Sequence, residues 1–165
     1  MKTHSIGRLP AIFGMLSSWL GVSPPEPKAA REQRELRVAV STLLAEIARV
    51  GTSSDSQTWT AAARAVADLC QTNADEAQAL IGAARQPASR PTSYFPSVSV
   101  LNSRLSPEQK VRFMEHVWQV ACADGEIGLY QDRLARKFAN LLYVAHADIV
   151  LSRHRIRTAM KVRTG

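Results

Sequence analysis

The stretch SPEQKVRFMEHVWQVACADGEIGLYQDRLARKFANLL, residues 106–142, decides the fold class. It opens with Ser106, Pro107 and Gln109: an N-cap, a proline at the first helical position and a side chain that reaches back to the cap. Apolar residues then recur at helical spacing up to the Asp124–Gly125 turn, and a second periodic run follows the turn. We therefore predict two consecutive helices joined by a tight turn.

The same periodicity predicts further helices over about residues 31–50, 56–70, 72–85 and 147–161. Thr72 and Asp75 resemble a capping box at the start of the third of these helices. Residues 86–104 contain several prolines and serines and lose the periodicity, so we predict a long loop, part of which packs on the core. Because no stretch alternates in the manner of a strand, the fold class is predicted to be all-α.

A shift of 73 residues superposes the two halves of the chain weakly, and the helix patterns then follow the same order. The matched positions include Ala48 with Ala121, Leu69 with Leu142 and Gly51 with Asp124. We predict two three-helix units packed about a pseudo-twofold axis, with their bends at one edge.

Length and composition favour one soluble globular domain, since the chain has 165 residues, of which 45% are hydrophobic and 21% charged. No apolar run reaches the roughly 18 residues that a bilayer span needs. We divide the chain into residues 1–28, an N-terminal amphipathic segment with a proline-rich hinge, and residues 29–165, the helical domain. The apolar face of the N-terminal segment either docks on its own domain or lies on a membrane. Cys70 and Cys122 are predicted to be buried thiols in the reducing cytoplasm.

Residues 118–142, WQVACADGEIGLYQDRLARKFANLL, together with His146–Asp148 and Arg153–Arg155, resemble the tellurite-resistance TerB family of small all-helical bacterial proteins. The likeness extends from roughly residue 36 to residue 157. The resemblance implies a stress-associated protein without an established enzymatic activity. It also implies an acidic, metal-binding patch, built from an Ala-Asp-Gly-Glu corner and a following Glu in each half.

The chain departs from that pattern where metal chemistry needs it. Gln131 stands at the position of the second-half Glu, and Gly51 and Thr58 replace the acids of the first half. A calcium ion needs six to eight oxygen ligands, so we expect metal binding to be reduced or lost. The remaining candidate ligands are Asp124, Glu126 and Asp132, and a divalent cation is the only cofactor that the sequence suggests.

The formal charge of +7 is concentrated at the C-terminal end, where eight cations follow residue 132 against one acid, Asp148. We predict an anion- or partner-binding surface on the last helix, formed by Arg153, Arg155, Arg157, Lys161 and Arg163. The leading hypothesis is a cytoplasmic, non-enzymatic binding or scaffold module for other proteins of a stress-response system. The alternative is a peripheral module at the inner face of an anionic membrane, which uses the N-terminal and C-terminal helices. Nucleic acid is a weaker candidate, because no DNA-reading motif accompanies the charge.

We predict no enzymatic activity. The histidines fall in different elements without metal-pair spacing, and Cys122 is followed by Asp124 and Glu126, whose charges disfavour a thiolate.

Overall fold

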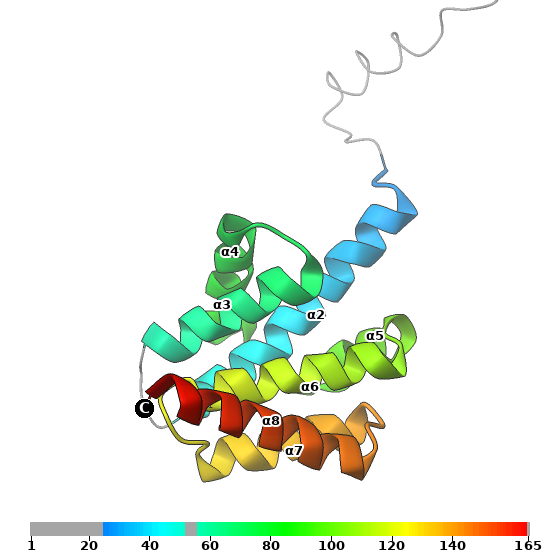
Figure 1. Ribbon diagram of the computed structural model, residues 1–165. Coiled ribbons are helices and arrows are strands. Elements are labelled where there is room, and N and C mark those ends of the chain that lie inside the picture. The colour runs from blue at the N-terminus through cyan, green and yellow to red at the C-terminus, as the bar shows by residue number, and fades with distance from the viewer. Residues whose placement is uncertain (1–24, 52–55, 165) are drawn as a thin grey trace, which may run out of the picture. The chain divides into compact units, whose positions relative to one another are not determined.

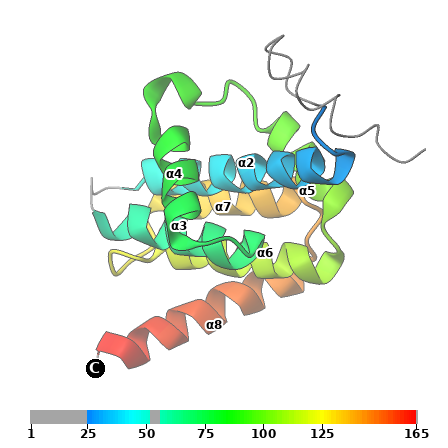
Figure 2. The ribbon, with the colours of Figure 1, turned by 90° about the horizontal axis from the view of Figure 1, so that it is seen from above.

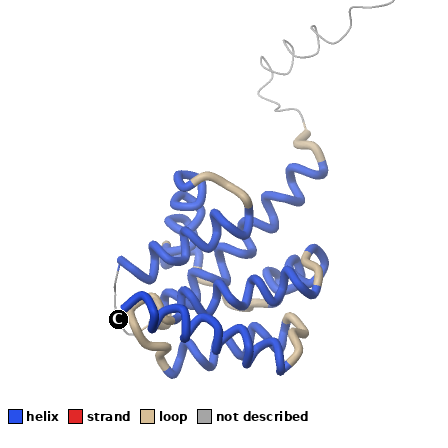
Figure 3. Tube along the Cα trace, viewed as in Figure 1, coloured by secondary structure: helices blue, strands red, loops and turns tan. Residues whose placement is uncertain are grey.

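The computed structural model describes residues 25–51 and 56–164, with the backbone alone for residues 163 and 164. Within these residues every regular element is helical and none is a strand (Figure 3), so the predicted all-α class is confirmed. The elements are α2 (Lys28–Arg49), α3 (Ser56–Cys70), α4 (Ala74–Arg85), a short 3-10 turn η1 (Pro87–Ser89), α5 (Phe95–Arg104), α6 (Pro107–Ala121), α7 (Leu129–Leu141) and α8 (His146–Thr164).

The chain divides into two compact units, residues 1–32 and 33–165. Of the first unit the structure describes residues 25–32, and α2 begins among them at Lys28, with an ion pair between Lys28 and Glu32 at 3.8 Å. The apolar face predicted for the N-terminal segment lies outside the described residues. The proposed domain boundary at residue 28 therefore stays a prediction.

Helix α6 organises the second unit. It packs against α3, α7 and α8, while α3 also packs against α4 (Figures 1 and 2). A capping box starts this helix: Ser106 Oγ accepts from the Gln109 N–H, and Gln109 Oε1 accepts from the Ser106 N–H. Six apolar side chains of α6 are buried, and Val111 near its start is half-buried. The buried core draws on every α-helix of the unit, and its largest apolar members are Leu43, Leu44, Ile47, Leu101, Phe113, Met114, Trp118, Phe138 and Leu142.

The predicted long loop over residues 86–104 is wrong in its second half, where α5 begins at Phe95. Pro96 lies in the first turn of this helix, where a missing N–H is tolerated, so it does not break the helix. Val98 and Leu101 are buried at i, i+3 spacing and hold α5 on the core. The expectation that part of this segment packs is confirmed.

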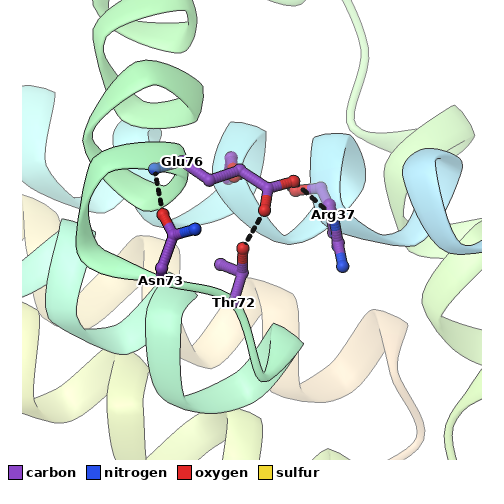
Figure 4. A network of polar contacts seen from close by, with 5 residues as sticks. Arg37, Thr72, Asn73 and Glu76 are labelled. Atoms are coloured by element: carbon purple, nitrogen blue, oxygen red, sulfur yellow. Dashed lines mark hydrogen bonds and ion pairs between the residues drawn. The ribbon is translucent and has the colours of Figure 1, made fainter.

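The start of α4 also differs from the prediction. Its N-cap is Asn73, whose side chain accepts from the Glu76 N–H at 2.8 Å, whereas Thr72 donates its hydroxyl to the Glu76 carboxylate. The same carboxylate accepts from Arg37 of α2 (Figure 4). Glu76 therefore links the start of α4 to α2.

A buried carboxylate lies inside α2. Glu46 is 1% exposed and forms an ion pair with Arg49 of the same helix, while its Oε2 accepts from the Tyr94 hydroxyl at 3.3 Å and lies 4.0 Å from Arg90 Nε. Arg49 in turn donates to the Ala84 carbonyl at the end of α4, at 2.7 Å. Burial lowers the pKa of the Arg49 guanidinium, and the nearby charge of Arg90 lowers it further.

Removal of the Glu46 carboxylate should destabilise the fold strongly, because it leaves the half-buried Arg49 guanidinium without its counterion. We expect Glu46→Ala to lower the free energy of unfolding by about 3–5 kcal/mol, and Glu46→Gln by less, since Gln still accepts from Tyr94. Urea denaturation followed by circular dichroism measures both. Glu35→Ala in the same helix is the control, because Glu35 pairs with Arg104 at the surface and its loss should cost no more than about 1 kcal/mol. Equal losses for Glu46→Ala and Glu35→Ala would contradict the buried-pair interpretation.

Candidate functional site

The corner between α6 and α7 places the predicted metal ligands in different surroundings. Gly125 has φ +117°, a left-handed conformation that only glycine adopts at low cost, so the turn predicted at Asp124–Gly125 is confirmed. Glu126, next to it, is exposed, and Asp124 is half-buried. Beyond the turn, Gln131 Oε1 accepts from the Gly128 N–H at 3.0 Å and caps the start of α7.

Gln131 connects this corner to the end of α2. Its side chain is 1% exposed, and its Nε2 points to the Ile47 carbonyl at 3.5 Å. A Cβ atom built on Gly51 would lie 2.9 Å from the same Nε2, so Gly51 leaves the room that the amide occupies. The structure thus brings the end of α2 to the start of α7, while the pseudo-twofold repeat itself stays a prediction.

Asp132 is held by two guanidinium groups. Its Oδ2 accepts from Arg136 Nε at 2.8 Å, one turn further along α7, and its Oδ1 lies 2.9 Å from Arg153 Nη2 of α8. In the part of the chain that the structure describes, no three His, Cys, Asp or Glu residues converge as metal ligands. Metal binding by Asp124, Glu126 and Asp132 stays a prediction, and a cation at Asp132 would have to compete with both arginines.

The predicted cations of α8 fall on different sides of the helix. Arg155 forms an ion pair with Glu115 of α6 at 3.2 Å, whereas Arg153 lies over the buried Trp118 ring, 5.7 Å from its centroid. Arg157 and Lys161 are exposed, and the side chain of Arg163 lies outside the described residues. Arg153, Arg157 and Lys161, at four-residue spacing, form one row that we call the basic edge.

Two grooves flank the basic edge, and all three of its residues line both. The first, of about 330 Å³, lies between α8 and the α6–α7 corner and is completed by Cys122, Gly125, Glu126, Ile127 and Met160. The second, also about 330 Å³, lies between α8 and α7 and is completed by Arg136, Ile149, Val150, His154 and Thr158. Arg136 was not among the predicted residues, since its place beside the basic edge depends on how α7 packs.

Both thiols are buried, as predicted. Burial raises the pKa of Cys70 to about 11. It also raises the pKa of Cys122, and the Asp124 charge that the sequence suggested as the cause acts in the same direction but is a smaller contribution. Each thiol is therefore protonated near neutral pH and is a poor nucleophile.

Comparison with family models identifies the chain. The model described as tellurite resistance protein TerB matches residues 37–154, more than half of the chain. The protein therefore belongs to the TerB family, as the resemblance in the sequence predicted. Comparisons with curated proteins and with solved structures give no match.

Loss of the Gln131 side chain should loosen the contact between α2 and α7. We expect Gln131→Ala to lower the free energy of unfolding by about 1–2 kcal/mol, because α7 loses a cap and the Gly128 N–H loses its acceptor. Urea denaturation measures the change. Gln78→Ala on the exposed face of α4 is the matched control and should change stability by less than about 0.5 kcal/mol. If both variants behave like the parent protein, Gln131 does not carry this contact.

Proposed function

We propose that this TerB-family protein is a non-enzymatic binding module that recognises an acidic surface of a partner protein with the basic edge of α8. The observation that carries the proposal is the row of Arg153, Arg157 and Lys161, which lines both grooves and is joined by Arg136 from α7. Such a concentration of one charge steers and holds partners of opposite charge. The family description supports a role of the tellurite-resistance type, with other proteins of a stress-response system as the expected partners.

The packing of α8 supports a rigid surface rather than a mobile tail. Ile149 of α8 is buried, and Ser152 of the same helix accepts from the indole N–H of Trp118 in α6 at 3.2 Å. The guanidinium of Arg153 lies over the Trp118 ring and contacts Asp132. A preorganised surface loses less conformational entropy when a partner binds.

Neutralisation of the basic edge should weaken binding of an acidic peptide more than neutralisation elsewhere. We expect the double variant Arg157→Gln/Lys161→Gln to bind a fluorescent poly-glutamate peptide at least fivefold more weakly in an anisotropy titration at low salt. The control, Arg64→Gln/Arg133→Gln, removes the same two charges from exposed positions on α3 and α7. Equal weakening by the two double variants would mean that net charge alone attracts the peptide, and the proposal would fail.

A peripheral membrane module is the second candidate, favoured by exposed apolar side chains on α8. Val150 and Leu151 are each 50% exposed and Val162 is 78% exposed, on a helix that also presents Arg157 and Lys161. Interfacial helices combine such apolar contacts with cations, each worth about 1 kcal/mol near an anionic leaflet. No helix among the described residues is long and apolar enough to cross a bilayer.

Flotation with vesicles tests the membrane candidate. We expect recovery with anionic vesicles at low salt but not with neutral ones, and Leu151→Glu should reduce that recovery because it places a charge where an apolar side chain enters the interface. Leu129→Glu is the matched control, since Leu129 is a similarly exposed leucine on α7. A protein that remains in the soluble fraction with anionic vesicles excludes this candidate.

A further inference from the structure

The groove between α7 and α8 is lined by four cationic side chains and by no acid. Arg136 comes from α7 and Arg153, Arg157 and Lys161 from α8, and the groove has a volume of about 330 Å³. This volume is about ten times the ~30 Å³ that one water molecule occupies in the liquid, so a small charged group with a few attached atoms fits.

Asp132 forms ion pairs with two of these cations, Arg136 and Arg153. Its carboxylate accepts from Arg136 Nε at 2.8 Å and lies 2.9 Å from Arg153 Nη2. One carboxylate carries a single negative charge and contacts two guanidiniums, so a positive excess remains at this cluster. The Arg153 Nε atom is buried and has no hydrogen-bond partner in the described part of the chain. The two guanidiniums are thus positioned while donors remain for a ligand.

A phosphate monoester matches this arrangement better than a carboxylate does. It carries about −1.5 to −2 charges near pH 7 and three acceptor oxygens, which can contact donors from two helices at once. Guanidiniums bind phosphate through paired N–H donors, and a lysine ammonium adds a point charge. A single carboxylate supplies one charge, as Asp132 already does.

We propose that the groove between α7 and α8 binds a phosphate monoester through Arg136, Arg153, Arg157 and Lys161, with Asp132 as the internal counterion that positions Arg136 and Arg153. The inference rests on the proposed function in that it uses the same basic edge, and it specifies the ligand chemistry. The monoester belongs either to a small soluble molecule or to a lipid headgroup.

Calorimetric titration of the full chain with glycerol phosphate at low salt tests the proposal, with glycerol as the probe that lacks the phosphate. Arg136→Gln and Arg157→Gln should each weaken binding about tenfold, because each removes a charge-assisted contact. Arg133→Gln, an exposed cation of α7 that does not line the groove, is the matched control and should leave affinity within about twofold. Asp132→Asn should strengthen binding roughly three- to tenfold, because it removes the competing charge and keeps an acceptor for Arg136.

Vesicles distinguish the two sources of the monoester. Binding to phosphatidic acid vesicles, but not to phosphatidylglycerol vesicles of equal charge, identifies a lipid monoester; binding of glycerol phosphate without preference between the vesicles identifies a soluble one.

Two results would overturn the inference: no heat with glycerol phosphate in either the parent protein or Asp132→Asn, or equal weakening by Arg133→Gln and Arg136→Gln. Because Arg157 is exposed, Arg157→Gln keeps the test valid if Arg136→Gln lowers stability.

If glycerol phosphate does not bind but the poly-glutamate peptide still distinguishes the two double variants, only this inference falls. If phosphate binds as described and the peptide does not distinguish them, only the proposed function falls.

Discussion

The buried carboxylate of Glu46 is the constraint on which the rest of the structure depends. A carboxylate removed from water costs several kcal/mol unless cations and hydrogen-bond donors surround it. Arg49 lies one turn away on α2, but Arg90 and the Tyr94 hydroxyl come from the segment between α4 and α5. That segment must therefore return to α2, which is why Tyr94, just before α5, approaches the core.

Tyr94 links Glu46 of α2 to α7. Its ring meets Phe138 edge-on at a centroid distance of 5.1 Å, and the Lys137 ammonium lies 5.2 Å from the ring centroid. Aromatic pairs of this geometry contribute beyond their buried area, so they restrict the position of the helix that bears them. At the other end of α7, Gln131 contacts the end of α2. With both ends of α7 fixed, the position of Asp132 and Arg136 beside α8 is fixed as well.

Local signals in the sequence predicted the helices, because capping and periodicity depend on neighbours a few residues apart. The capping box at Ser106 and the turn at Gly125 are of this kind. Helix α5 was missed because Pro96 counts as a helix breaker unless its place in the first turn is known. Glu46 was missed because its burial depends on tertiary packing, including a contact with Tyr94, which is 48 residues away. The spacing of Arg153, Arg157 and Lys161 was visible, but the addition of Arg136 requires the position of α7 relative to α8 in space.

Glu46 and Asp132 each form carboxylate–arginine ion pairs, but the two carboxylates differ in burial and in what their arginines contact. At Glu46 the carboxylate is buried, and the Arg49 guanidinium reaches on to the Ala84 carbonyl, so the pair is committed to holding helices together. At Asp132 the carboxylate is only partly buried, and both of its arginines also line an open groove. A divalent cation that approaches Asp132 meets two positive charges already in contact with its ligand, which opposes binding. An anion meets those same charges held in place, with guanidinium donors beyond the two that Asp132 engages. In the proposed phosphate site, Asp132, which the sequence suggests as a metal ligand, acts instead as the counterion that holds Arg136 of α7 and Arg153 of α8 beside the groove.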